Sequence, residues 1–140
     1  MLIVADSNLI VAAAVKEHAF HARATAALAE PRRKGELLLP QHVLIETFSV
    51  ITRSPPPLRL LPHQAYRLIN ENYGSCRIIS MSADVTWRFL RERDASTAGG
   101  AVYDALIAIT AIEAGAQRLL TFNPKHFQPF AHQIEIVVPA

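Results

Sequence analysis

The sequence has little of what secreted and membrane proteins need. Its 140 residues contain a single cysteine, Cys76, so no internal disulfide framework can form, and one thiol is compatible with a reducing compartment. The apolar run at the N-terminus stops at Asp6 and no basic segment precedes it, so it is too short for a signal peptide or a membrane span. We therefore expect a cytoplasmic protein that does not enter a membrane.

Two widespread site motifs are also missing. Gly99 and Gly100 lack the flanking pattern of a P-loop or a dinucleotide fingerprint, so nucleotide cofactors are not expected. The six histidines form no His-Glu-x-x-His pattern, and His126 has no obvious ligand partner in the sequence, which disfavours zinc. We therefore expect the histidines to be surface or packing residues.

The composition is that of one compact domain. Hydrophobic residues make up 51% of the chain and charged residues 19%, which is enough apolar material for a core, so we expect a single domain over residues 1–140. Fourteen Lys and Arg against twelve Asp and Glu leave a formal net charge of +2, which favours a polyanionic partner only weakly. Charge alone therefore does not identify a ligand.

Short apolar runs alternate with longer segments of helical period. The runs predict strands at 2–5, 36–39, 77–79, 118–121 and 134–138, and the periodic segments predict helices at 8–15, 18–29, 41–52, 63–72, 83–93 and 101–114. Pro31 is expected to end the second helix, and the prolines at 55–57 to form a loop. Strands that are apolar throughout and alternate with helices predict a three-layer α/β/α sandwich with a central parallel sheet.

Ligands of such sheets bind beyond the carboxyl ends of the strands, where two polar segments of this sequence lie. Asp6 follows the first strand, with Ser7 and Asn8 able to support it, and Thr121 and Asn123 follow the fourth. Asp6 alone is equally well explained as the N-cap of the next helix. The position of Asp6 therefore indicates a functional site only if other acids lie beside it.

Two further carboxylates stand among apolar residues of predicted helices. Glu46 lies in a mostly apolar stretch without a secure cationic partner, although a solvated helix face would also explain it. Asp104 is the only charged residue between Asp94 and Glu113, although a favourable interaction with the helix dipole would also explain a first-turn Asp. Three separated carboxylates without a Cys/His cluster favour a hard cation such as Mg²⁺ or Mn²⁺.

Basic residues that could contact phosphate are scattered. The densest cluster is Arg32, Arg33 and Lys34, and such a cluster is usually a solvated loop. Arg88, Arg91 and Lys125 are phosphate-contact candidates only if they lie near the crevice.

Taken in order, several blocks of the chain resemble the VapC-type toxins of the PIN-domain family. These blocks are Leu2-Ile3-Val4-Ala5-Asp6-Ser7-Asn8, Leu44-Ile45-Glu46, Gly99-Gly100-Ala101-Val102-Tyr103-Asp104-Ala105-Leu106-Ile107-Ala108, Leu119-Leu120-Thr121-Phe122-Asn123-Pro124-Lys125-His126-Phe127, and a terminal Val-Val-Pro. The resemblance covers nearly the whole chain, and the third and fourth blocks are its most specific part.

The resemblance implies a Mg²⁺- or Mn²⁺-dependent endoribonuclease toxin that acts on RNA and often forms a homodimer. It also implies neutralisation by a cognate VapB-like antitoxin whose tail occupies the active-site groove. Asp6, Glu46 and Asp104 carry over as metal-binding catalytic acids, with Ser7, Asn8 and Thr121 in support. Family members often have a fourth acid where this chain has the neutral Asn123, so one or two metal ions remain possible.

Two other classes of protein compete with this interpretation. A haloacid-dehalogenase-type phosphotransferase would need a second Asp two residues after Asp6, and Asn8 occupies that position. A non-catalytic α/β binding or regulatory module of the same fold would use Asp6 as a helix cap only, and it is the main alternative.

Overall fold

A computed structural model describes all 140 residues, and its elements alternate as the apolar pattern predicts. In chain order they are β1 (Ile3–Ala5), α1 (Ser7–Ala14), α2 (His21–Arg33), β2 (Leu37–Pro40), α3 (Gln41–Arg53), α4 (Pro62–Tyr73), β3 (Arg77–Ile79), η1 (Ala83–Val85), α5 (Thr86–Arg91), η2 (Ala95–Thr97), α6 (Ala101–Glu113), β4 (Arg118–Leu120), η3 (Pro124–Phe130) and β5 (Glu135–Val137).

The five strands form one parallel sheet in the order β3-β2-β1-β4-β5. From β1 the chain first moves outward through β2 to β3, and it later returns to the other side of β1 to add β4 and β5. The strand order therefore reverses between β1 and β4. In open parallel sheets, such a switch point opens a crevice at the carboxyl edge.

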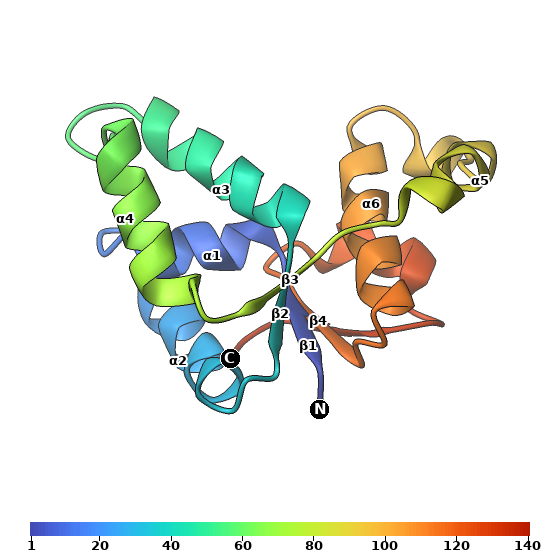
Figure 1. Ribbon diagram of the computed structural model, residues 1–140, viewed down its shortest axis with the longest axis horizontal. Helices are drawn as coiled ribbons and strands as arrows, with labels where there is room; N and C mark the ends of the chain where they lie inside the picture. Colours follow the sequence, from blue (N-terminus) through green and yellow to red (C-terminus); the bar gives the residue numbers. More distant parts are fainter.

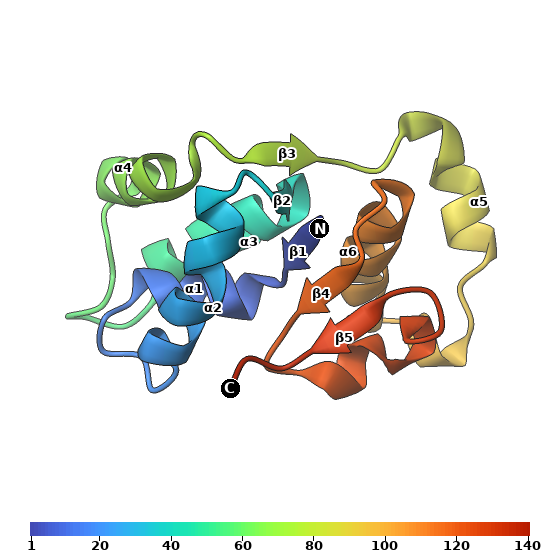
Figure 2. The ribbon, with the colours of Figure 1, turned by 90° about the horizontal axis from the view of Figure 1, so that it is seen from below.

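Helices cover both faces of the sheet. Figures 1 and 2 show α1, α2 and α4 on one side of the strands, and α6 with α5 on the other. This arrangement confirms the predicted three-layer α/β/α sandwich with a parallel central sheet. None of the helices combines the length and apolar character required to cross a membrane.

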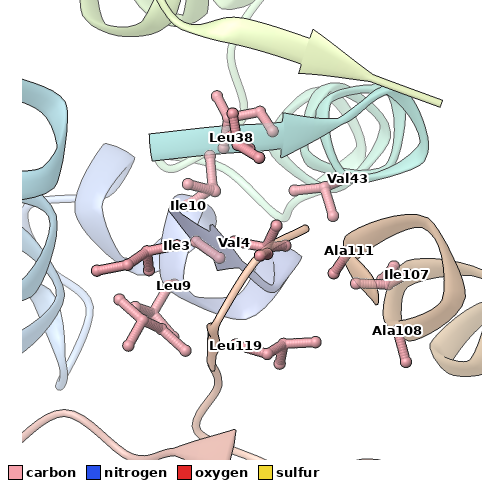
Figure 3. Packing of buried hydrophobic residues seen from close by; sticks show 14 of the residues in the cluster. Ile3, Val4, Leu9, Ile10, Leu38, Val43, Ile107, Ala108, Ala111 and Leu119 are labelled. Atoms are coloured by element: carbon pink, nitrogen blue, oxygen red, sulfur yellow. The ribbon is translucent and has the colours of Figure 1, made fainter. Parts of the chain in front are cut away.

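The core surrounds the inner strands. All residues of β1 and β2 are buried, as expected for apolar strands with helices on both faces, whereas the edge strands β3 and β5 are partly exposed. Figure 3 shows Val4 between Ile10 of α1 on one side and Ala111 and Ile107 of α6 on the other. The small side chains of α6 allow it to lie close to the sheet, so Asp104 on the same helix is fixed in position.

Two predicted helices had wrong bounds. The second begins at His21 instead of residue 18, and it does not end before Pro31 but continues to Arg33. Pro31 is buried in the last turn, where it removes one helical hydrogen bond, and its carbonyl accepts the Glu36 N–H at 2.8 Å. The predicted helix at 83–93 is divided into η1 and the shorter α5, because the Ser82 side chain accepts the Asp84 N–H and starts a tighter turn.

Candidate functional site

The predicted acids meet at the switch point of the sheet. A cavity of about 350 Å³ lies there, lined by Asp6, Ser7, Asn8, Val11, His18, Glu46, Val50, Asp104, Asn123 and His126. Asp6 comes from the end of β1, and its N–H donates to the carbonyl of Leu120 at the end of β4. Glu46 comes from α3 and Asp104 from α6, so the cavity lies where both helical layers meet the sheet edge.

Asp6 is the most enclosed of the three acids, with only 5% of its surface exposed. Its Oδ1 accepts the backbone N–H of Ser7 at 2.7 Å, and its Oδ2 accepts the hydroxyl of Thr121 at 2.8 Å. Asp6 is therefore the N-cap residue of α1. It also lines the cavity, so capping the helix does not exclude a place for Asp6 in the site.

The charge of Asp6 has no cationic partner. Burial raises the pKa of Asp6 from its ordinary value of 3.8 to about 6, although the hydrogen bonds from Thr121 and Ser7 oppose the rise. The nearby charges of Asp104 and Glu46 raise it further. Asp6 is thus a desolvated carboxyl group beside two other carboxyl groups, an arrangement that a bound cation would relieve.

Glu46 is held between two side chains. The Ser7 hydroxyl donates to its Oε1 at 3.1 Å, and His42, one helical turn earlier on α3, places Nε2 3.1 Å from its Oε2. The imidazole of His42 is close to Glu46 but not aligned for a hydrogen bond. Its ring stacks on Tyr103 with centroids 5.1 Å apart, which links α3 to α6 beside the site.

Asp104 is half-buried on the first turn of α6. Burial raises its pKa, the imidazoles of His126 and His42 oppose this, and the charge of Glu46 adds to it. His126 places Nδ1 3.4 Å from Asp104 Oδ2. Because η3 carries His126, this contact joins α6 to the segment that follows β4.

Thr121 connects the two strand ends that form the cavity. Its hydroxyl donates to Asp6 and accepts the backbone N–H of Asn123 at 2.9 Å and the side-chain amide of Asn8 at 3.4 Å. The other end of the Asn8 side chain accepts the N–H of Phe122 at 3.3 Å. These bonds support the expected auxiliary roles of Ser7, Asn8 and Thr121 as residues that orient Asp6.

Asn123 lines the same cavity as the acids, as its position after β4 suggested. It begins η3, but its side chain caps no backbone N–H of that segment. The amide is therefore free to face a ligand in the cavity.

The structure places three of the histidines beside the acids, which the sequence did not indicate. His18 and His126 line the cavity, while His42 and His126 contact two of the acids. A recognisable signal existed for His42, because it stands four residues before Glu46 on one helix face. None existed for His18, which the fold brings from the α1–α2 connection.

The basic residues proposed for phosphate contact do not line the cavity. Arg88 donates to Glu113 at 3.1 Å instead, and Arg91 belongs to α5, which Figure 1 shows at the far end of the molecule from α4. Lys125 is exposed on η3 beside His126, outside the cavity lining.

The donor set fits a hard divalent cation. Asp6, Glu46, Asp104 and Asn123 offer carboxylate and amide oxygens, which are the ligands of Mg²⁺ and Mn²⁺, and no thiol lines the cavity. The acids face a common space without converging on one point as a preformed ligand cluster. A cation would therefore have to draw the side chains together, most readily the less buried Glu46 and Asp104.

Comparisons with known proteins agree with this fold and identify the family. A family model described as PIN domain matches residues 3–132. Ribonuclease VapC27 of Mycobacterium tuberculosis is 36% identical over 113 residues, covering 80% of this chain and 78% of the relative. Ribonuclease VapC40 of the same species is 34% identical over 120 residues, covering 84% of each chain. The chain therefore belongs to the PIN-domain family and is related to its VapC-type proteins.

Solved structures share the fold at low sequence identity. A chain of the VapBC2 complex from Rickettsia felis, bound to a promoter DNA fragment, matches with a TM-score of 0.69 at 20% identity and full coverage of both chains. VapC20 of M. tuberculosis, a toxin that cleaves the sarcin-ricin loop, matches with a TM-score of 0.61 at 20% identity, covering 84% of this chain and 86% of that chain.

Proposed function

We propose that this protein is a Mg²⁺- or Mn²⁺-dependent endoribonuclease, with Asp6, Glu46 and Asp104 as its metal-binding catalytic acids and Asn123 at a fourth position. The observation that carries the proposal is the buried, unpaired Asp6 in a cavity that two other carboxylates share. The names of the two ribonuclease relatives support RNA as the substrate.

A divalent ion at these oxygens would supply positive charge for the scissile phosphate and acidify water for attack on it. Neighbouring side chains contact each of the three acids at this site. Thr121 and Ser7 donate hydrogen bonds to Asp6, Ser7 also donates to Glu46, and the imidazoles of His42 and His126 lie beside Glu46 and Asp104. Because these contacts come from several elements, they keep the three acids beside one cavity, where a cation can draw their oxygens together.

We extend the proposal to the partners that a VapC-type protein implies. Residues 1–140 would act as one domain in the cytoplasm, form a homodimer, and be neutralised by a VapB-like antitoxin encoded beside this chain. Sedimentation of the purified protein, alone and with the product of the adjacent reading frame, tests both associations.

An RNA cleavage assay tests the function. Purified protein should cleave a species in total bacterial RNA with Mn²⁺ or Mg²⁺ present, and EDTA should stop cleavage. Asp6→Ala, Glu46→Ala and Asp104→Ala should each lower the rate at least about 100-fold, whereas Asp84→Ala, an exposed carboxylate far from the cavity, should not. The product of the adjacent reading frame should inhibit the wild type.

Two results would contradict the proposal. Cleavage by the purified protein that persists in EDTA and in all three variants would show that it needs neither the metal nor these acids. No cleavage by a well-folded wild type on total RNA would favour the non-catalytic binding module.

A further inference from the structure

The carboxylates of the cavity would repel an anionic substrate. A phosphodiester is an anion, and three carboxylates line the space that must receive it, while no lysine or arginine does. A bound cation neutralises part of this charge, but the phosphate oxygens also need hydrogen-bond donors. The nitrogen donors among the lining side chains belong to His18, His126, Asn8 and Asn123.

Only one of these donors has no partner within the chain and does not belong to the proposed metal site. The Asn8 amide is directed to Thr121, His126 contacts Asp104, and Asn123 occupies the proposed fourth position of the metal site. His18 contacts none of the acids. It is half-buried on the connection between α1 and α2.

The backbone determines which nitrogen of His18 carries its hydrogen. The N–H of Phe20 donates to His18 Nδ1 at 3.0 Å, so Nδ1 is an acceptor and the hydrogen of the neutral ring lies on Nε2. No group of the chain accepts a hydrogen bond from Nε2. His18 therefore carries an N–H donor that no group of the chain uses, on a residue that lines the cavity.

The segment that carries His18 is attached to the end of β4. The ring of Phe20 packs on that of Phe122 with centroids 4.7 Å apart, and Phe122 stands between Thr121 and Asn123. The Arg23 guanidinium lies over both rings, at 4.7 and 5.1 Å, and donates to the carbonyl of Pro139 at 2.6 Å. These contacts attach the segment that carries His18 to the residues next to Thr121 and Asn123.

We propose that His18 is a substrate-binding residue that donates from Nε2 to a phosphate oxygen of the RNA backbone at the cavity. The inference rests on the proposed ribonuclease function and adds the group that receives the anion. It requires only the neutral ring, because the Phe20 N–H already selects the Nε2–H form.

Two isosteric variants separate the two nitrogens of the ring. Asparagine can place an acceptor near the position of Nδ1 but reaches nothing at Nε2, whereas glutamine can place an N–H near Nε2 and loses the acceptor for Phe20. A hydrogen bond to a charged group typically changes a rate constant about 10- to 100-fold when lost. His63→Asn, an exposed histidine on α4, is the matched control.

The readouts are first-order cleavage of the species that the wild type cuts in total bacterial RNA, with Mn²⁺ and enzyme in excess over that species, and melting temperature. We expect cleavage by His18→Asn to be at least about 10-fold slower at an unchanged melting temperature. His18→Gln should recover to within about threefold of the wild type, and His63→Asn should equal it.

Other patterns would overturn the inference. A slower His18→Gln with an intact His18→Asn would show that the contact with Phe20 alone matters. Equal rates in both variants, whether intact or lost, would show that the Nε2–H has no separate role. A wild type that cleaves no RNA would instead remove the proposed function, so the two failures can be distinguished.

Discussion

Asp6 combines burial with a negative charge, and its protonation should affect stability. In the folded, metal-free protein, burial raises the pKa of Asp6 to about 6 from an ordinary 3.8. The folded state therefore holds this proton more tightly than the unfolded state. Between about pH 4 and pH 6 the contribution of Asp6 to the free energy of unfolding must fall as pH rises, by up to about 3 kcal/mol in total.

Urea unfolding in EDTA between pH 4 and pH 8 measures this effect. In Asp6→Asn, the free energy of unfolding should no longer show the decrease with pH that Asp6 causes. In Asp84→Asn, which changes an exposed position, the decrease should be the same as in the wild type. Identical pH profiles for the wild type and Asp6→Asn would mean that Asp6 is solvated or paired in solution.

Asn123 provides a second prediction at the scale of one residue. If its amide borders the metal, Asn123→Asp adds a negative charge there and should tighten Mn²⁺ binding about 10-fold or more. Asn123→Ala should weaken binding less than Asp6→Ala, because it removes a neutral group. Calorimetric titration of Asn123→Asp, Asn123→Ala and Asp6→Ala with Mn²⁺ measures the order of their affinities. An unchanged affinity in Asn123→Asp would place residue 123 outside the metal site.

The acids were predictable from the sequence, but the histidines were not. Asp6, Glu46 and Asp104 each interrupt an apolar run, and a charge in that setting needs an explanation. His18 and His126 stand in polar surroundings where a histidine needs none. Their role depends on the α1–α2 connection and η3 both reaching the end of β4, which no local pattern encodes.

At the scale of elements, the strands and most helices followed from apolar periodicity. β3 and α4 were predicted to within one residue at each end, because an apolar run marks the strand and apolar residues at helical spacing mark the helix. The errors occurred where tertiary contacts outweigh local preference. Pro31 stays inside α2 because it is buried, and its missing hydrogen bond lies in the last turn, where the loss is small.

The positions of the acids on their helices affect the repulsion among them. Asp6 caps α1, Glu46 lies on the second turn of α3, and Asp104 lies on the first turn of α6. Asp6 and Asp104 lie at helix N-termini, where the helix dipole favours negative charge, whereas Glu46 lies beyond the first turn of α3. The dipoles therefore offset part of the repulsion among the carboxylates.

For the whole molecule, a bound cation should stabilise the fold by mass action. A ligand at 100 times its dissociation constant contributes about 2.7 kcal/mol to folding, which is several degrees in melting temperature for a domain of this size. Mn²⁺ should therefore raise the melting temperature of the wild type, by more at pH 7.5 than at pH 5, because protons compete for Asp6.

Asp104→Asn should show much less of this shift, and Asp84→Asn should show all of it. Differential scanning calorimetry with and without EDTA makes the measurement. An equal shift in all three proteins would indicate nonspecific binding of the ion, and no shift in any would favour the binding-module alternative.

The order of the strands also determines when the cavity can exist during synthesis of the chain. Asp6 and Thr121 are 115 positions apart, and β1 lies beside β4 in the sheet. A growing chain can pair β1 with β2 early, but the other side of β1 stays open until residues 118–120 have left the ribosome. All three carboxylates have been synthesised by then, yet the hydroxyl that orients Asp6 and the segment that carries His126 are still missing. A growing chain is therefore expected to lack the assembled site until β4 and η3 have left the ribosome, so no cleavage is expected from a chain that has not yet reached them.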